Sequence, residues 1–314
     1  MLDERGKNLD CPALPRHGNF ITSRISRGGA DKMRIRIMTD FHYALHAGQA
    51  EDLFYKEYIK RFFGEGPEAD YYVSLGDLTQ NGTEREYRGA FGMIDSFGIR
   101  DRFLHVPGNH DLLQVDAGQT ERWGSTPPVS EGNGCVDTDA ATLLFLNTCQ
   151  TGKPLDWGGR IGQAQTELLR SKLSAAKGKP VLVFAHHPLP DTTALSDTTM
   201  MRIEEASPLI GVMNEAAGPC LWFNGHNHIH SIVRKDSWTF VQTASVLCLP
   251  CWREIVIADD AVTVGTTNLN DAQLDELAGQ SMDRFPSFHR VPPEKAAGTA
   301  ADQSTDVPIG KRYK

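Results

Sequence analysis

Five short polar clusters contain most of the residues that could do chemistry, and each cluster directly follows an apolar run. In chain order they are Thr39-Asp40-Phe41-His42, Gly76-Asp77, Gly108-Asn109-His110-Asp111, His186-His187-Pro188 and Gly225-His226-Asn227-His228. Their donor atoms are carboxylate and amide oxygens and imidazole nitrogens, and no cluster contains a cysteine. That donor set suits divalent ions such as Mn, Fe or Zn. Because the donors exceed what one ion needs, the clusters predict two metal sites that share a bridging carboxylate.

The apolar runs before the clusters predict strands that bring the clusters together. We expect these strands over residues 33–38, 71–75, 102–106, 180–185 and 220–223. In α/β sheets, sites form outside the carboxyl ends of strands. Asp40 and His42 are two residues apart, as are His226 and His228, so strand alternation would point each pair the same way. Glycine precedes several of the cluster residues, which allows tight turns and close approach of the backbone.

Taken in order, the motifs Asp-x-His, Gly-Asp-x-x-x-x-Gly, Gly-Asn-His-Asp, His-x-Pro and Gly-His-x-His resemble the calcineurin-like metallophosphoesterase superfamily. The resemblance covers roughly residues 33–267. Each motif alone is weak evidence for the resemblance. Five motifs in this order, each after a predicted strand, are specific evidence for it. The compact form is most similar to the bacterial class III-type phosphodiesterases, a branch with cyclic-nucleotide and glycerophosphodiester enzymes.

The resemblance implies a ligand set for two divalent metal ions. One ion would be held by Asp40, His42, Asp77 and His228, and the other by Asp77, Asn109, His186 and His226. Asp77 would then bridge the two ions. His186 fits the family's His-x-Pro spacing, so the adjacent His187 is expected near the substrate or behind a ligand.

Two further catalytic roles also follow from the resemblance. His110 would face the substrate, with Asp111 orienting it, and Asn81 is a candidate substrate contact. The chain departs from the family pattern at Asp111, where many relatives have Glu. It also departs at Gln80 and Asn81, where many relatives carry an acidic residue or an Arg.

The charge of such a site favours an anionic substrate, because two divalent ions outweigh two carboxylates and a hydroxide. Metal binding lowers the pKa of water from 15.7 to about 7, so hydroxide exists at neutral pH. We therefore predict a phosphoester hydrolase, preferably a phosphodiesterase that acts on a small molecule by attack of a metal-bridging hydroxide. The alternatives are a phosphomonoesterase or a nucleoside-diphosphate pyrophosphohydrolase. A non-catalytic metal-binding scaffold is disfavoured, because every ligand position and His110 are present.

Composition limits the partners and the compartment. The 314 residues carry a net charge of -8, so the composition gives no sign of the basic surface that binds nucleic acid. No apolar run approaches the ~20 residues of a membrane span, and the polar start of the chain has no secretory signal pattern. Six cysteines are too few for a disulfide scaffold at this length. We predict a reduced, cytoplasmic protein with no membrane contact, for which a dimer is one option for the oligomeric state.

The order of the predicted elements indicates a layered α/β fold. Early strands alternate with helices, whereas later strands follow one another, which favours mixed pairing. The resemblance implies a four-layer α/β/β/α sandwich. We divide the chain into an irregular N-terminal extension (1–32), a catalytic domain (33–267), a C-terminal helix (268–290) and a flexible tail (291–314). Inside the domain, we expect a long loop over 112–138 and a helix over about 201–216.

Cys248 and Cys251 have the CxxC spacing of some redox and zinc sites. There is no second CxxC in the chain, and this one follows a strand rather than opening a helix. We therefore predict two reduced cysteines in a loop.

Overall fold

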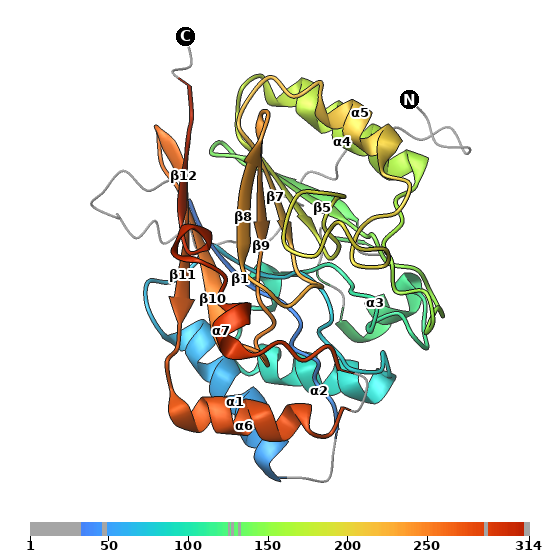
Figure 1. Cartoon of the computed structure of the whole chain (residues 1–314), viewed down its shortest axis with the longest axis vertical. Coiled ribbons are helices and arrows are strands. Elements are labelled where there is room, and N and C mark those ends of the chain that lie inside the picture. Colours follow the sequence, from blue (N-terminus) through green and yellow to red (C-terminus); the bar gives the residue numbers. More distant parts are fainter. Residues whose placement is uncertain are drawn as a thin grey trace.

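The computed structural model describes residues 33–45, 49–124, 126, 129–130, 133–285 and 288–310. Two six-stranded sheets pack face to face, and helices cover the outer face of each sheet (Figure 1). This arrangement confirms the expected four-layer α/β/β/α sandwich. The predicted irregular extension over 1–32 lies outside the described residues.

The first sheet is mixed, with the strand order β12-β11-β10-β1-β2-β3. Its strands are β1 (Met33–Met38), β2 (Tyr71–Ser74), β3 (Phe103–His105), β10 (Cys251–Ile257), β11 (Ala261–Asn268) and β12 (Thr305–Pro308). β1, β2 and β3 run parallel, while β10, β11 and β12 pair antiparallel. The carboxyl ends of β1, β2 and β3 therefore meet at one edge.

The second sheet is also mixed, with the strand order β4-β5-β6-β7-β9-β8. Its strands are β4 (Gly134–Asp137), β5 (Thr142–Leu146), β6 (Val181–Ala185), β7 (Cys220–Asn224), β8 (Ser231–Lys235) and β9 (Trp238–Gln242). β5, β6, β7 and β9 are parallel neighbours. Their carboxyl ends thus also share an edge.

The helices form the two outer layers. Those on the first sheet are α1 (Gln49–Gly64), α2 (Glu84–Asp95) and α6 (Ala272–Met282), and those on the second are α4 (Gln163–Ala176) and α5 (Ser207–Met213). α1 and α6 lie side by side (Figure 1). Short elements complete the chain: α3 (Ala117–Gly124), α7 (Pro293–Ala296) and 3-10 turns at Arg100–Arg102 and Ala300–Asp302.

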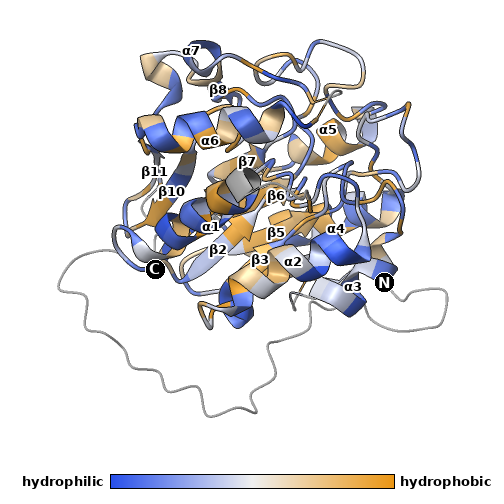
Figure 2. Cartoon of the chain, turned by 90° about the horizontal axis from the view of Figure 1, so that it is seen from below, coloured by the Kyte–Doolittle hydropathy of each residue, from blue (hydrophilic) through white to orange (hydrophobic). Residues whose placement is uncertain are grey.

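An apolar core between the sheets fixes their relative position. The strands at the centre are largely hydrophobic, whereas α4 and α6 alternate hydrophobic and hydrophilic residues (Figure 2). Within this core the Phe184 ring stacks between Phe145 and Phe223, with centroid distances of 5.0 and 5.3 Å. Offset aromatic pairs of this kind add to the hydrophobic gain of burial. Strands of both sheets contribute side chains to this core, so its burial holds the two sheets together.

The aromatic run of α1 also packs as core, as its helical spacing predicts. The rings of Phe54, Tyr55, Tyr58 and Phe62 are fully buried against the first sheet.

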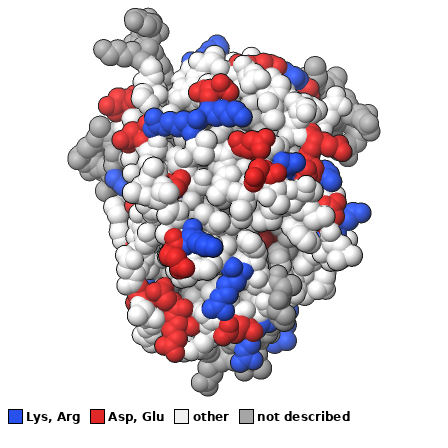
Figure 3. Space-filling view, viewed as in Figure 1, with Lys and Arg blue, Asp and Glu red and all other residues white. Residues whose placement is uncertain are grey.

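On the molecular face in Figure 3, Lys and Arg side chains lie among Asp and Glu side chains. No helix among the described residues is long and apolar enough to cross a membrane.

Two predicted elements inside the domain differ from the structure. The segment 112–138 is not one loop, since it contains α3 and the edge strand β4. β4 has only four residues, so it is too short to show a period-2 pattern. The helix expected over 201–216 is reduced to α5, because Pro208 lies in its first turn and Glu205 before it has a left-handed φ of 54°.

The flexible tail predicted from residue 291 is wrong for the described part of the C-terminus. β12 pairs antiparallel with β11, and Val307 and Ile309 join the core between the sheets. The buried Arg253 guanidinium donates to the carbonyl of Asp302, 2.7 Å away. Polar composition made this segment look disordered, but pairing with a distant strand orders it.

We expect Phe184→Ala to lower the free energy of unfolding by about 3–5 kcal/mol, because it leaves a cavity between two stacked rings. Urea unfolding followed by circular dichroism measures this change. Leu155→Ala is the control, since Leu155 is 83% exposed and should change stability by less than about 0.5 kcal/mol. Equal losses in both variants would contradict the assignment of this core.

Candidate metal centre

The five predicted clusters converge where the parallel strands of both sheets end. The first sheet supplies the residues after β1, β2 and β3, and the second supplies those after β6 and β7. Backbone hydrogen bonds join the loops, with the amide of Asp40 donating to Gly76 O at 3.0 Å and that of His42 donating to Asp77 O at 2.8 Å. The amide of Gly225 donates to His186 O at 3.0 Å. The predicted cluster residues thus come from distant parts of the chain to one place.

Several of these residues have a left-handed backbone. The φ angles are 52° at Asp40, 48° at His42, 49° at Asp77, 70° at His226 and 61° at His228. Such conformations cost roughly 1–3 kcal/mol each in residues other than glycine, and they concentrate at functional sites. The expectation that strand alternation aims the pairs is wrong, because β1 ends at Met38 and β7 at Asn224. Left-handed turns beyond the strands aim them instead.

Two glycines allow the loops to approach closely, as the sequence predicts. A Cβ at Gly108 would lie 2.0 Å from Asp77 Oδ1. A Cβ at Gly225 would lie 2.0 Å from Thr39 Oγ1 and 2.5 Å from Asp40 Oδ2. No other residue fits at these positions without moving a carboxylate of the site.

The first ligand group consists of Asp40, His42, Asp77 and His228. Asp40 Oδ1 lies 3.3 Å from His228 Nε2 and 3.9 Å from His42 Nε2. His42 Nε2 lies 3.7 Å from Asp77 Oδ2. Asp40 Oδ1 and His42 Nε2 are buried and make no hydrogen bond among the described residues. Buried polar atoms are normally satisfied, so these two atoms fit the ligands of a metal ion.

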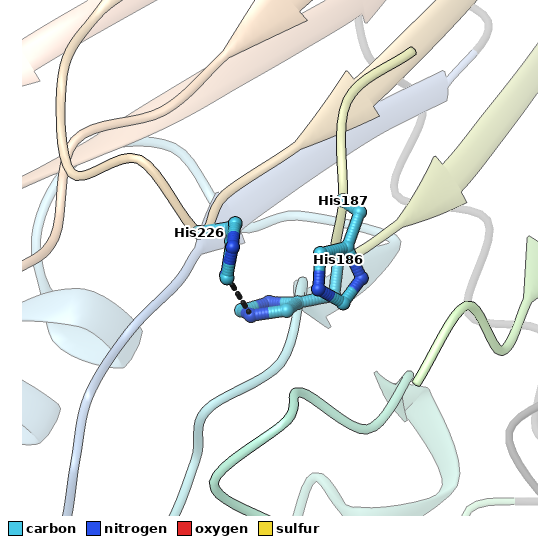
Figure 4. Close-up of side chains that lie close together, drawn as sticks. All are labelled: His186, His187 and His226. Atoms are coloured by element: carbon cyan, nitrogen blue, oxygen red, sulfur yellow. Dashed lines mark hydrogen bonds between the residues drawn. The ribbon is translucent and has the colours of Figure 1, made fainter. Parts of the chain in front are cut away.

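The second ligand group consists of Asp77, Asn109, His186 and His226. His186 Nε2 lies 3.5 Å from Asp77 Oδ2, 3.1 Å from Asn109 Oδ1 and 3.2 Å from His226 Nδ1. Figure 4 shows His186 and His226 meeting from the loops after β6 and β7. Since Asp77 Oδ2 is near His42 and His186 alike, it lies between the two groups. That position fits a bridging carboxylate.

The electrostatics of the site depend on buried carboxylates beside imidazoles. Burial raises the pKa of Asp40, but the adjacent His228 outweighs it and lowers that pKa to about 2. Burial also raises the pKa of Asp77, but the neighbouring His186 outweighs it and holds that pKa well below its ordinary value. Burial lowers the pKa of His186, and Asp77 raises it to about 9. The carboxylates are thus ionised at neutral pH, and the protons on their partners occupy positions that a divalent ion would take.

Each ligand histidine is oriented through its other ring nitrogen by a protein oxygen. The pairs are His42 Nδ1 with Gln80 Oε1 at 2.9 Å, His186 Nδ1 with Leu75 O at 2.9 Å, His226 Nε2 with Met200 O at 2.9 Å and His228 Nδ1 with His289 O at 2.6 Å. A carbonyl only accepts, so the ring nitrogen that faces it carries the proton. The remaining nitrogens of His42, His186 and His228 face Asp40 or Asp77. That of His226 faces His186 Nε2, so all four point into the site, as metal-ligating histidines require.

Comparison with known families agrees with this geometry. Residues 33–230 match the family described as calcineurin-like phosphoesterase. The chain belongs to the calcineurin-like phosphoesterase family. The match ends shortly after His228 and thus includes every residue of both ligand groups.

Two curated relatives of this phosphoesterase are phosphodiesterases by name. A glycerophosphodiester phosphodiesterase of Enterobacter lignolyticus is 29% identical over 164 residues, which is 51% of this chain and 56% of that protein. A probable cyclic nucleotide phosphodiesterase of Rhodopseudomonas palustris is 26% identical over 205 residues, 62% of this chain and 72% of that protein. The chain thus spans just over half the length of the first relative.

Solved structures with a similar trace include the phosphopantetheinyl hydrolase of Mycobacterium tuberculosis. It is 14% identical, and the match covers 69% of this chain and 91% of that chain with a TM-score of 0.42. A putative 5'-nucleotidase of Staphylococcus aureus is 13% identical, with coverage of 80% and 58% and a TM-score of 0.43.

His110 lies at the rim of the phosphoesterase site. Its backbone amide donates to Asp77 Oδ1 at 2.8 Å, and its Nδ1 lies 2.7 Å from Gln80 O. The His110 ring packs edge-on against His42, with centroids 4.7 Å apart. Gln80 therefore supports both histidines, one through its side chain and one through its backbone. In the sequence, the only signal for this supporting role of Gln80 is its position in the loop after Asp77.

Asp111 does not orient His110, contrary to the expectation from the family. Its buried carboxylate accepts hydrogen bonds from the backbone amides of Gly108, Leu78 and Thr79 and from Thr79 Oγ1. Burial and the charge of Asp77 raise the pKa of Asp111 to about 6. Asp111 therefore ties the loop after β3 to the loop after β2.

His187 and Asn81 are both engaged by protein groups. His187 is fully buried, with Nδ1 2.9 Å from Thr148 Oγ1 and Nε2 2.8 Å from Trp157 O. Its ring packs against His226, with centroids 4.3 Å apart. His187 therefore has no ring nitrogen free for substrate and supports a ligand from behind. The exposed Asn81 donates its side-chain amide to Glu86, and its contact with substrate stays a prediction.

We expect Asp77→Asn to abolish stoichiometric binding of both ions, because one carboxylate serves both ligand groups. Mn²⁺ titration by calorimetry, with metal content by mass spectrometry, measures the loss. Asp101→Asn is the matched control, since Asp101 is exposed in the turn before β3. A variant at position 77 that keeps one tight ion would show that the carboxylate is not shared.

We expect Gln80→Leu to weaken Mn²⁺ binding or activity by roughly 10–100-fold, because His42 loses the acceptor that orients it. Gln80→Glu keeps an acceptor oxygen and should restore much of that affinity. Full affinity in Gln80→Leu would mean that packing alone orients His42.

Proposed function

We propose that this phosphoesterase is a dinuclear-metal phosphodiesterase that acts on small-molecule phosphoesters. The observation that carries the proposal is the pair of ligand groups that meet at Asp77, with His110 beside them. The names of the curated relatives support a diester substrate. A phosphomonoesterase or a nucleoside-diphosphate pyrophosphohydrolase is the alternative within catalysis.

The two ligand groups would hold the ions, and oxygen with imidazole donors suits Mn, Fe or Zn. When bound, such ions lower the pKa of water to about 7 and stabilise charge on a phosphoryl oxygen. The protein contributes a dry and preorganised ligand set. Buried Asp40 and Asp77 supply the negative charge, and the Gln80, Leu75, Met200 and His289 oxygens fix the rings.

His110 supplies the proton chemistry in this proposal. Its Nδ1 carries a proton toward Gln80 O, which leaves Nε2 as the ring nitrogen for the substrate. His110 is half-buried, so its ring is accessible beside the ligand groups. As an imidazolium it can donate a proton to the leaving oxygen, a role typically worth about 10²–10⁴-fold in rate.

A reducing compartment such as the cytoplasm fits the state of the cysteines. Cys135, Cys149, Cys220, Cys248 and Cys251 are free thiols among the described residues. Cys248 lies in a loop as predicted, whereas Cys251 is the first residue of β10. Light scattering measures the oligomeric state and distinguishes a dimer from a monomer.

We expect the Mn²⁺-loaded protein to hydrolyse bis-p-nitrophenyl phosphate with a higher kcat/KM than p-nitrophenyl phosphate. Initial rates on both substrates at matched metal concentration measure the preference. A large preference for the monoester would favour the alternative. Bound metal without hydrolysis of either substrate, or of cyclic nucleotides and glycerophosphodiesters, would favour a scaffold.

We expect His110→Ala to lower kcat by about 10²–10⁴-fold while both ions stay bound, because in this proposal His110 donates a proton to the substrate and is not a metal ligand. Steady-state kinetics and metal content are measured on the same sample. Loss of metal together with activity would show that His110 is part of the ligand set.

A further inference from the structure

The segment 288–291 lies between α6 and α7 (Figure 1). It packs against the first ligand group. The family match ends at residue 230, so this segment lies outside it. The ring of Phe288 stacks on His228, with centroids 4.9 Å apart and planes 25° apart. The same ring meets His42 edge-on, with a centroid distance of 4.9 Å. One aromatic side chain thus contacts both histidines of the first ligand group.

The backbone of this segment is anchored on both sides of Phe288. His228 Nδ1 donates to His289 O at 2.6 Å, and the amide of Val291 donates to Cys248 Sγ at 3.4 Å. The amide of Phe288 donates to Phe285 O at 3.0 Å. Val291 is buried with Cys248 in one small apolar cluster. These contacts give the Phe288 ring a fixed place beside the metal ligands.

The side chain of His289 has a different environment from its carbonyl. Its ring lies 5.5 Å from the His228 ring, centroid to centroid, and the residue is exposed. An accessible imidazole N–H beside a metal ligand can donate a hydrogen bond to a bound anion.

We propose that residues 288–291 form a wall of the metal centre, in which Phe288 positions His42 and His228 and His289 contacts the substrate. Phe288 fills the space beside both rings, so its loss lets them rotate away from the first ion. The exposed His289 ring lies beside His228, so we expect its imidazole to meet the part of the phosphoester nearest the first ion. The role of His289 rests on the proposed phosphoesterase function, whereas the role of Phe288 rests on metal binding alone.

The first test measures Mn²⁺ binding in the absence of substrate. Phe288→Ala should weaken one of the two ions by roughly 10–100-fold and leave the other unchanged, as is typical when a support of a ligand is lost. Phe288→Tyr keeps the ring and should bind both ions as the wild type does. Arg290→Ala is the control in the same segment, since the exposed Arg290 forms its ion pair with Asp283, away from the ligand groups. Wild-type affinity for both ions in Phe288→Ala would overturn the role of Phe288.

The second test uses His289→Ala, which removes the imidazole and keeps the carbonyl that holds His228. Mn²⁺ affinity and thermal stability should stay at wild-type values. KM for bis-p-nitrophenyl phosphate should rise roughly tenfold, the loss expected for a hydrogen bond to a charged group. Unchanged KM and kcat would overturn the substrate contact. Wild-type protein that binds Mn²⁺ but hydrolyses nothing would instead refute the proposed function and leave the Phe288 result intact.

Discussion

The buried charge of Asp77 is the constraint on which the rest of the structure depends. Its carboxylate is almost fully enclosed, and the ion pairs that the described residues offer it come from His42 and His186. A buried carboxylate without compensating charge costs several kcal/mol. The imidazoles must therefore carry protons, or divalent ions must replace those protons. The shifted pKa values of Asp77 and His186 in opposite directions express the same coupling.

This constraint explains why the site needs two sheets rather than one. The first sheet delivers Asp40, His42, Asp77 and Asn109, and the second delivers His186, His226 and His228. A small shift between the sheets would separate Asp77 from His186 while each sheet stayed intact. The apolar core between the sheets, to which strands of both sheets contribute, opposes such a shift. The favourable free energy of burying this core thus offsets the cost of the left-handed turns beside the ligands.

Sequence alone could predict which polar clusters converge and the strands before them, since an apolar run followed by a polar cluster is a local pattern. It predicted the close approach at Gly108 and Gly225 for the same reason. It gave the wrong cause for the convergence of Asp40 and His42, because a left-handed φ in a non-glycine residue has no compositional signal. β12 was missed because its order comes from pairing with β11, across a long separation in sequence.

The supports of the histidines divide the two ligand groups in a way that the motifs do not show. His186 and His226 are held by the carbonyls of Leu75 and Met200, which any side chain at those positions would provide. His42 instead depends on the side chain of Gln80 and on the Phe288 ring. Substitution can therefore alter the first group while the second keeps its geometry. In the proposed dinuclear site, the affinity of the first ion would therefore respond to substitutions at Gln80 and Phe288, which lie outside the five clusters.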